Sequence, residues 1–172
     1  MRWVYRLRQF LLRARPRGPS IDRERARAVL PEGAYRLFEK MSPGDRAHAL
    51  CVARLLRRRG QITPEVEQAA LLHDVGKVGG GLALPYRGLV VILNRINGHW
   101  LDHLAKADPA SWRYPFYVHL HHAELGACWC ERAGCPALTV ALVRHHESAL
   151  DSVGDPVLAE KLARLQQADN MC

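Results

Sequence analysis

The stretch "LLHDVGK", residues 71–77, sets a histidine beside an aspartate at the end of an apolar run. The residues before it, "ITPEVEQAA", predict a helix whose apolar face continues through Val66 and Ala69 to His73. An ionisable pair buried in such a place is costly unless it has partners. Neutral imidazole and carboxylate are ligands for zinc, iron or manganese, so metal ions are the partners we expect for His73 and Asp74.

Four other predicted helices also place a histidine or an aspartate on the face that should be buried. They are His48 with Cys51, Val52 and Leu55; His122 with Val118, Leu125 and Trp129; His145 with Leu138, Ala141 and Leu142, and His146 one step round; and Asp169 with Leu158, Leu162 and Leu165. A single histidine on an apolar face is usually a hydrogen-bonded core residue, and an aspartate at a helix end is usually a cap. Five helices with this feature favour one shared solution, a metal site. The ligands outnumber the needs of one ion, so we expect two ions bridged by Asp74, which suits in-line phosphoryl displacement.

These residues, in this order, resemble the HD superfamily of metal-dependent phosphohydrolases. The family signature H…HD…D is matched by His48, His73, Asp74 and Asp169. The longer pattern is similar to HD-GYP and related HDIG phosphodiesterases, because "HAELG" supplies His122 and Gly126, "RHHE" supplies His145 and His146, and "HDVGK" matches HDxGK. The match covers residues 42–170.

The resemblance implies an all-α fold, an HD-domain helical bundle with a metal site at its centre. One metal would take His48, His73, Asp74 and Asp169, and the other would take Asp74, His122, His145 and His146. The implied cofactors are two divalent transition metal ions, iron or manganese ahead of zinc, nickel or magnesium. His119 and His121 are rival assignments near His122, but the "HxxxG" spacing and the apolar stripe favour His122.

The resemblance also implies roles toward a substrate. Asp74 and Lys77 would be catalytic, and Lys77 would face the substrate phosphate. Arg144 and Arg113 are further candidates for binding and neutralising it. The expected reaction is hydrolysis of a phosphomonoester or phosphodiester of a nucleotide or a similar anionic metabolite.

The chain also departs from the HD-GYP pattern. No "GYP" follows "HHE", where the chain reads "HHESALDSVGDP", so cleavage of cyclic di-GMP is not indicated. Asp74 and His122 are 48 positions apart, and the insertion at residues 79–115 is interpreted as a lid or a lipid-facing hairpin. Two alternative functions stay open: an HD-type diiron oxygenase related to inositol oxygenase, and a non-catalytic metal-binding module.

Composition sets broad limits on the class of protein. The chain has 172 residues, enough for one domain with its own core, and a net charge of +8. A basic chain suits anionic partners, and we expect a small phosphorylated substrate; no specific nucleic-acid partner is inferred and no oligomeric state is predicted. No run of 18 apolar residues is present, so no transmembrane helix is expected.

The five cysteines are interpreted as reduced thiols. They are Cys51, Cys128, Cys130, Cys135 and Cys172, an odd number with no spacing typical of a zinc site. We therefore expect a cytoplasmic protein, with contact at the inner membrane face as an option for its basic N-terminus.

The predicted helices cover most of the chain. They span 20–30, 32–41, 43–59, 63–74, 87–106, 116–134, 136–148 and 155–170, with loops at 78–85 and 107–115 and no substantial sheet. Residues 1–19 form a separate basic segment ahead of an HD-type domain at 20–172. Its residues 1–17 carry six arginines and no acid, which indicates an amphipathic helix docked on the domain, a membrane-surface helix, or a disordered arm.

Overall fold

The computed structural model describes residues 20–80 and 105–172, and within these ranges it contains seven α-helices, two 3-10 helices and no strand. The helices are α2 (Ser20–Val29), α3 (Glu32–Lys40), α4 (Pro43–Arg58), α5 (Pro64–Leu72), η1 (Val75–Lys77), α8 (Tyr114–Arg132), α9 (Ala137–His145), η2 (Leu150–Ser152) and α10 (Pro156–Asp169). The predicted all-α class is therefore confirmed for the described residues. The basic segment 1–19, nearly all of the predicted helix 87–106 and most of the 79–115 insertion lie outside them.

Side-chain caps stand at the start of three helices and glycines follow the end of two, close to the boundaries that the sequence predicts. Ser42, Thr63 and Asp155 each accept a hydrogen bond from a backbone N–H of the following first turn, at 3.1, 3.4 and 2.8 Å. Gly60 and Gly134 follow α4 and α8 with φ of 65° and 81°, values that favour glycine. Some boundaries differ by two or three residues: α5, α8 and α9 end at residues 72, 132 and 145 and not at 74, 134 and 148. Helix α8 also begins at residue 114 and not at 116, because a proline in the first turn is compatible with a helix.

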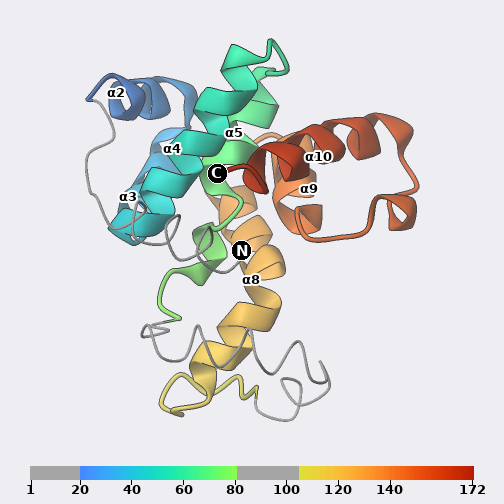
Figure 1. The fold of residues 1–172 in the computed structure, drawn as a ribbon. Helices are drawn as coiled ribbons and strands as arrows, with labels where there is room; N and C mark the ends of the chain where they lie inside the picture. The colour runs from blue at the N-terminus through green and yellow to red at the C-terminus, as the bar shows by residue number, and fades with distance from the viewer. Residues whose placement is uncertain (1–19, 81–104) are drawn as a thin grey trace, which may run out of the picture.

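Helix α5 lies at the centre of the bundle. It packs against α2, α3, α4, α9 and α10, and Figure 1 shows it among the other helices near the end of α10. Its residues Val66–Leu72 are all buried, so this helix has no solvent face over its last two turns. His73 and Asp74 follow directly after this helix and therefore lie in the interior. In the described parts of the chain, no helix combines the length and apolarity needed to cross a membrane.

A network of ion pairs fixes the first turns of α5. Glu67 is 3% exposed and accepts hydrogen bonds from Arg25 on α2 and Arg57 on α4. Asp22 on α2 accepts from Arg54 and Arg57. Because a buried carboxylate needs partners of opposite charge, these contacts hold α2, α4 and α5 in one arrangement.

Two glycines let the turn after α5 lie directly on α8. A Cβ built on Gly76 would come within 1.9 Å of the carbonyl oxygen of His122, and one on Gly126 within 3.1 Å of the Gly76 nitrogen. Neither position has room for a side chain without a shift of backbone. This close approach of η1 and α8 brings Asp74 beside His122, and it explains why both motifs contain a glycine.

The expectation that all cysteines are reduced is wrong for two of them. Cys51 on α4 and Cys172, after the end of α10, form a disulfide, while Cys128, Cys130 and Cys135 are free. The two residues are 121 positions apart, and only the packing of α10 on α4 brings them together. Cysteine spacing along the sequence gives no sign of this pairing.

Candidate metal centre

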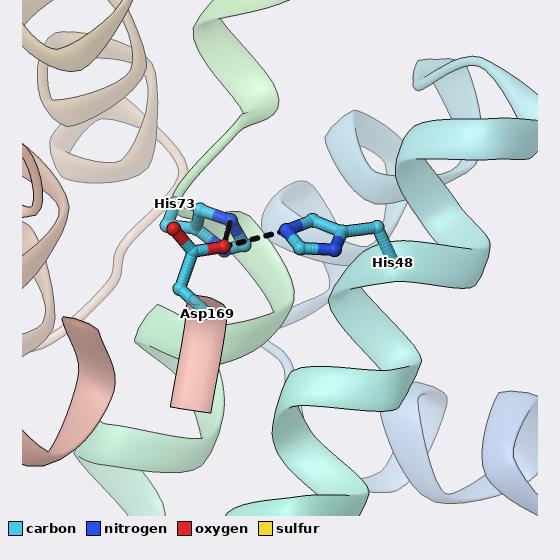
Figure 2. A group of neighbouring side chains, drawn as sticks. All are labelled: His48, His73 and Asp169. Atoms are coloured by element: carbon cyan, nitrogen blue, oxygen red, sulfur yellow. Dashed lines mark hydrogen bonds and ion pairs between the residues drawn. The ribbon is translucent and has the colours of Figure 1, made fainter. Parts of the chain in front are cut away.

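His48, His73 and Asp169 form the first of two groups of side chains that could hold a metal ion. Figure 2 shows them converging from α4, from the end of α5 and from the end of α10. The His48 Nε2 atom lies 2.6 Å from Asp169 Oδ1, and the His73 Nε2 atom lies 3.4 Å from the same oxygen. Three distant segments of the chain therefore point ligand atoms at one place.

Asp74, His122 and His146 form the second group. The Nε2 atoms of His122 and His146 are 3.2 Å apart, and each lies 3.8 Å from Asp74 Oδ1. All three residues are buried, with His122 fully enclosed. They come from the turn after α5, from the middle of α8 and from the end of α9.

Asp74 lies between the two groups. Its Oδ1 faces the second group, while its Oδ2 lies 3.7 Å from the Nε2 atom of His73 in the first group. The rings of His73 and His146 also meet, with centroids 5.4 Å apart. The two groups thus form one continuous polar centre, with one carboxylate oxygen of Asp74 turned to each.

The hydrogen bonds of three histidines fix which ring nitrogen faces the centre. In His73, His122 and His146 the Nδ1 atom lies 3.0, 2.7 and 2.8 Å from the carbonyl oxygen three residues earlier. A carbonyl oxygen only accepts hydrogen bonds, so each Nδ1 carries the hydrogen and donates it. In the neutral rings every Nε2 is then a bare acceptor directed into the centre, the arrangement of metal-binding histidines.

This donor set fits a bound cation. The neutral rings of His122 and His146 present two acceptors 3.2 Å apart with no hydrogen between them, and the buried Nε2 atom of His73 has no hydrogen-bond partner. Ligand atoms that share one ion at about 2.0–2.1 Å lie roughly 3 Å or slightly more apart. Metal ions, one at each group, are therefore partners that would satisfy these three nitrogens.

Two histidines of the centre are held in the neutral form that metal binding requires. Burial, and after it the positive charge of Lys77, lowers the pKa of His122 to about 4. Burial and the neighbouring His73 lower the pKa of His146 to about 4. At neutral pH both rings therefore carry free Nε2 lone pairs.

The ionisation of Asp74, Asp169 and His73 shows that the centre favours a bound cation. Burial alone would raise the pKa of Asp74 and Asp169, but His73 and Lys77 hold that of Asp74 well below its usual range, and the nearby rings of His48 and His73 do so for Asp169. For His73, burial lowers the pKa, but Asp74 and Asp169 outweigh it and the pKa is raised. The two carboxylates are thus ionised and favour a cation at His73, either a proton or a metal ion.

Lys77 contributes a positive charge to the same centre. Its Nζ atom lies 2.6 Å from Asp74 Oδ1, the oxygen that also faces His122 and His146. About a third of the Lys77 side chain is exposed, whereas Asp74 is nearly enclosed. The ammonium group can therefore neutralise Asp74 and still turn outward to an anion.

The structure does not bring His145, which the resemblance implies as a ligand, into either group. The Nδ1 atom of His145 lies 3.3 Å from Ser148 Oγ, and its neighbour His146 turns inward instead. The buried face of α9 runs through Thr139, Leu142 and Val143, and this face continues to His146. The stripe of Leu138 and Ala141 that favoured His145 is only partly buried.

The other candidate residues lie at different places. The guanidinium of Arg144 is paired with Glu124 on α8 at 2.9 Å, and Arg113 is a half-buried residue at the start of α8. His121 is exposed and contacts Tyr117, in keeping with the preference for His122. His119 is half-buried and its ring stacks at 6.0 Å on that of His122.

Glu147 is a site residue that the sequence reasoning missed. Its Oε1 lies 3.6 Å from the Nε2 atom of His122, and 59% of its side chain is exposed. The signal was present in "RHHE", where an acid directly follows the two histidines. Its carboxylate is within reach of the second group from the solvent side.

The fold and the site define an all-α protein with a buried centre of histidine and aspartate side chains that could hold metal ions. Comparison of the chain with protein-family models, with curated proteins and with solved structures finds no match. The functional conclusion therefore depends on the residues and their geometry.

Proposed function

We propose that the protein is a metal-dependent phosphohydrolase of the HD type, which hydrolyses a phosphomonoester or phosphodiester of a nucleotide or a similar anionic metabolite. The observation that carries this proposal is the position of Asp74 between two ligand groups, with the Lys77 ammonium group on its Oδ1 atom. Paired groups of this kind suit phosphoryl displacement, and a nearby lysine suits a phosphate.

The ligand sets support two divalent ions. His48, His73 and Asp169 would hold one ion, His122 and His146 would hold the other, and Asp74 would contact both. Imidazole and carboxylate ligands are compatible with iron or manganese, the preferred identities, and with zinc, nickel or magnesium. When bound, such ions supply an activated water at neutral pH and positive charge for the reacting phosphate.

The chain's own residues would bind and orient the substrate. Lys77 can turn its ammonium group from Asp74 to a phosphate oxygen, which neutralises charge that develops there. The side chains of Asp169 and Glu147 are 37% and 59% exposed, so the centre reaches solvent on their side. The net charge of +8 favours the approach of an anion.

The test is an activity screen with matched variants. The protein is loaded with Mn(II) or Fe(II) and assayed on phosphomonoesters, phosphodiesters and nucleotides. His122→Ala removes an enclosed histidine of the second group and should abolish turnover, whereas His121→Ala removes the exposed neighbour on the same helix and should leave it unchanged. The metal content of both variants shows whether the loss of turnover follows the loss of an ion.

Three results would contradict this function. A loaded, folded protein that hydrolyses no phosphoester in the panel would argue against it. Two bound irons with oxygen consumption and no hydrolysis would favour an HD-type diiron oxygenase instead. Tightly bound ions with neither reaction would favour a non-catalytic metal-binding module.

A further inference from the structure

The disulfide lies three residues beyond the first ligand group at both of its ends, on α4 and just after the end of α10. Cys51 is three residues after His48 on α4, and Cys172 is three residues after Asp169. The His48–Asp169 contact and the Cys51–Cys172 bridge therefore have the same sequence separation, 121 residues. His48 and Cys51, three apart on α4, share one face of that helix, and both meet the C-terminal end of α10, so the bridge and the ligand pair span the same interface.

The bridge lies next to the most exposed ligand of the first group, at a helix end. Asp169 is the last residue of α10, and 37% of its side chain is exposed. The backbone N–H of Cys172 donates to the carbonyl oxygen of Asp169 at 3.2 Å, so this last turn is linked directly to the bridge. Helix ends fray more readily than helix centres, and a covalent link at this end limits that motion.

We propose that Cys51 and Cys172 are positioning residues of the metal centre: their disulfide holds Asp169 against His48, and reduction of the bridge weakens the binding of a divalent ion at the first group. The proposal rests on the metal-binding part of the proposed function and is independent of the phosphoester chemistry. It makes metal occupancy responsive to thiol redox conditions.

The reduction is a thiol–disulfide exchange. A dithiol reductant donates two electrons and two protons, the S–S bond between Cys51 and Cys172 breaks, and both become thiols. The reductant leaves as its own disulfide. The free cysteines, Cys128, Cys130 and Cys135, are unchanged by this step.

The experiment measures metal affinity with the bridge closed and open. The full chain is stripped of metal, thiol titration establishes whether it is bridged or reduced, the reductant is removed without oxygen, and Co(II) is titrated by its absorption bands. We expect the dissociation constant of one ion to rise about 10–100-fold when the bridge is open, the usual effect of losing an outer support of a ligand. The second ion should bind as before.

Variants separate a positioning role from general stabilisation. The double variant Cys51→Ser/Cys172→Ser should bind Co(II) with the affinity of the reduced chain, whether or not reductant is added. Cys128→Ser, which changes a free cysteine, should show the affinities of the wild type in both redox states. In Asp169→Asn, which has already lost the ligand that the bridge positions, opening the bridge should have no further effect on affinity. A bridge that only stabilises the fold would lower Tm and leave the Co(II) bands and affinities of the folded protein unchanged.

Each contrary outcome is distinct. Equal Co(II) affinities in the bridged and reduced folded chains would contradict the positioning role of the disulfide but not the metal centre itself. Failure of Cys51 and Cys172 to form a bridge under oxidising conditions would also contradict that role. Absence of Co(II) binding in both redox states would contradict the metal centre and, with it, the positioning role of the disulfide.

Discussion

The contact between His122 and His146 is the strongest argument for a metal ion at the scale of single residues. Both rings donate from Nδ1 to a backbone carbonyl, so their Nε2 atoms meet at 3.2 Å as two acceptors. Burial keeps both pKa values near 4, so a proton does not bridge them at neutral pH. A buried pair of acceptors without a donor is unfavourable, and a shared cation removes the cost.

Adjacent histidines on α9 offer a direct test of the ligand assignment. His146→Ala should remove the ion of the second group, because it deletes a buried Nε2 directed at His122. His145→Ala should leave both ions bound, since that ring contacts Ser148 outside both groups. Metal analysis of the two purified variants measures this difference. If His145→Ala loses an ion and His146→Ala does not, the ligand set implied by the family resemblance is nearer the truth.

Lys77 should behave as a competitor of the second ion as well as a substrate-binding residue. Its ammonium group lies 2.6 Å from Asp74 Oδ1, the oxygen that the ion would share. Lys77→Ala should therefore keep both ions, bind the second at least as tightly as the wild type, and lose turnover on phosphoesters by about a hundredfold, on the order of 3 kcal/mol. Metal titration and steady-state kinetics check both parts. Normal turnover in this variant would exclude the role toward substrate.

At the scale of elements, the positions of the ligands depend on where the helices end and how they cross. Asp74 follows a helix whose last two turns are buried on every side, and the turn after it packs against the backbone of α8 at Gly76. The sequence predicts the end of α5 from its apolar run. It does not predict the crossing of η1 and α8, which depends on contacts between residues almost 50 positions apart.

Gly76→Ala tests this crossing. The added Cβ would lie 1.9 Å from the carbonyl oxygen of His122, and backbone on both sides leaves little freedom to move away. We expect a loss of at least about 2–3 kcal/mol in the free energy of unfolding, or a Tm lower by roughly 5–10 °C. Gly154→Ala is the control, because its Cβ would meet nothing within 4 Å. Similar Tm values for the two variants would show that the close approach is not required.

At the scale of the whole molecule, local patterns predicted the fold class, and long-range packing decided the details of the site. The helix caps at Ser42, Thr63 and Asp155 are short-range features, and a single sequence reveals them. The inward turn of His146 depends on how α9 rotates against α8. The Cys51–Cys172 bridge likewise depends on the packing of α10 on α4, so it could not be predicted from spacing.

The metal-free protein should lose stability in mild acid. His122 and His146 have folded pKa values near 4, below the ordinary value of 6.5, so between these values the unfolded chain binds protons that the folded chain does not. Stability is then present above pH 6.5 and is lost as the pH falls, by about 2 kcal/mol for each histidine between pH 7 and 5. His73, whose pKa is raised, opposes this, because its contribution is present below pH 6.5 and is lost as the pH rises.

Denaturant unfolding of the metal-free chain at pH 7, 6 and 5 measures the net effect. The loss of stability from His122 and His146 should exceed the gain from His73, so the free energy of unfolding should fall from pH 7 to pH 5. The lowered pKa values of Asp74 and Asp169 add a further loss in stronger acid, as both carboxylates become protonated. A free energy of unfolding that rises from pH 7 to pH 5 would mean that the second group is not held neutral.

The central claim is a two-ion centre organised by Asp74, and metal stoichiometry tests it most directly. The metal-replete wild type should contain two divalent ions per chain. Asp74→Asn should lose one or both, because it weakens the carboxylate that faces both groups. Asp151→Asn, which changes an exposed aspartate in η2, should keep two. A folded wild type without bound metal, or an Asp74→Asn variant that retains both ions at wild-type affinity, would contradict the account.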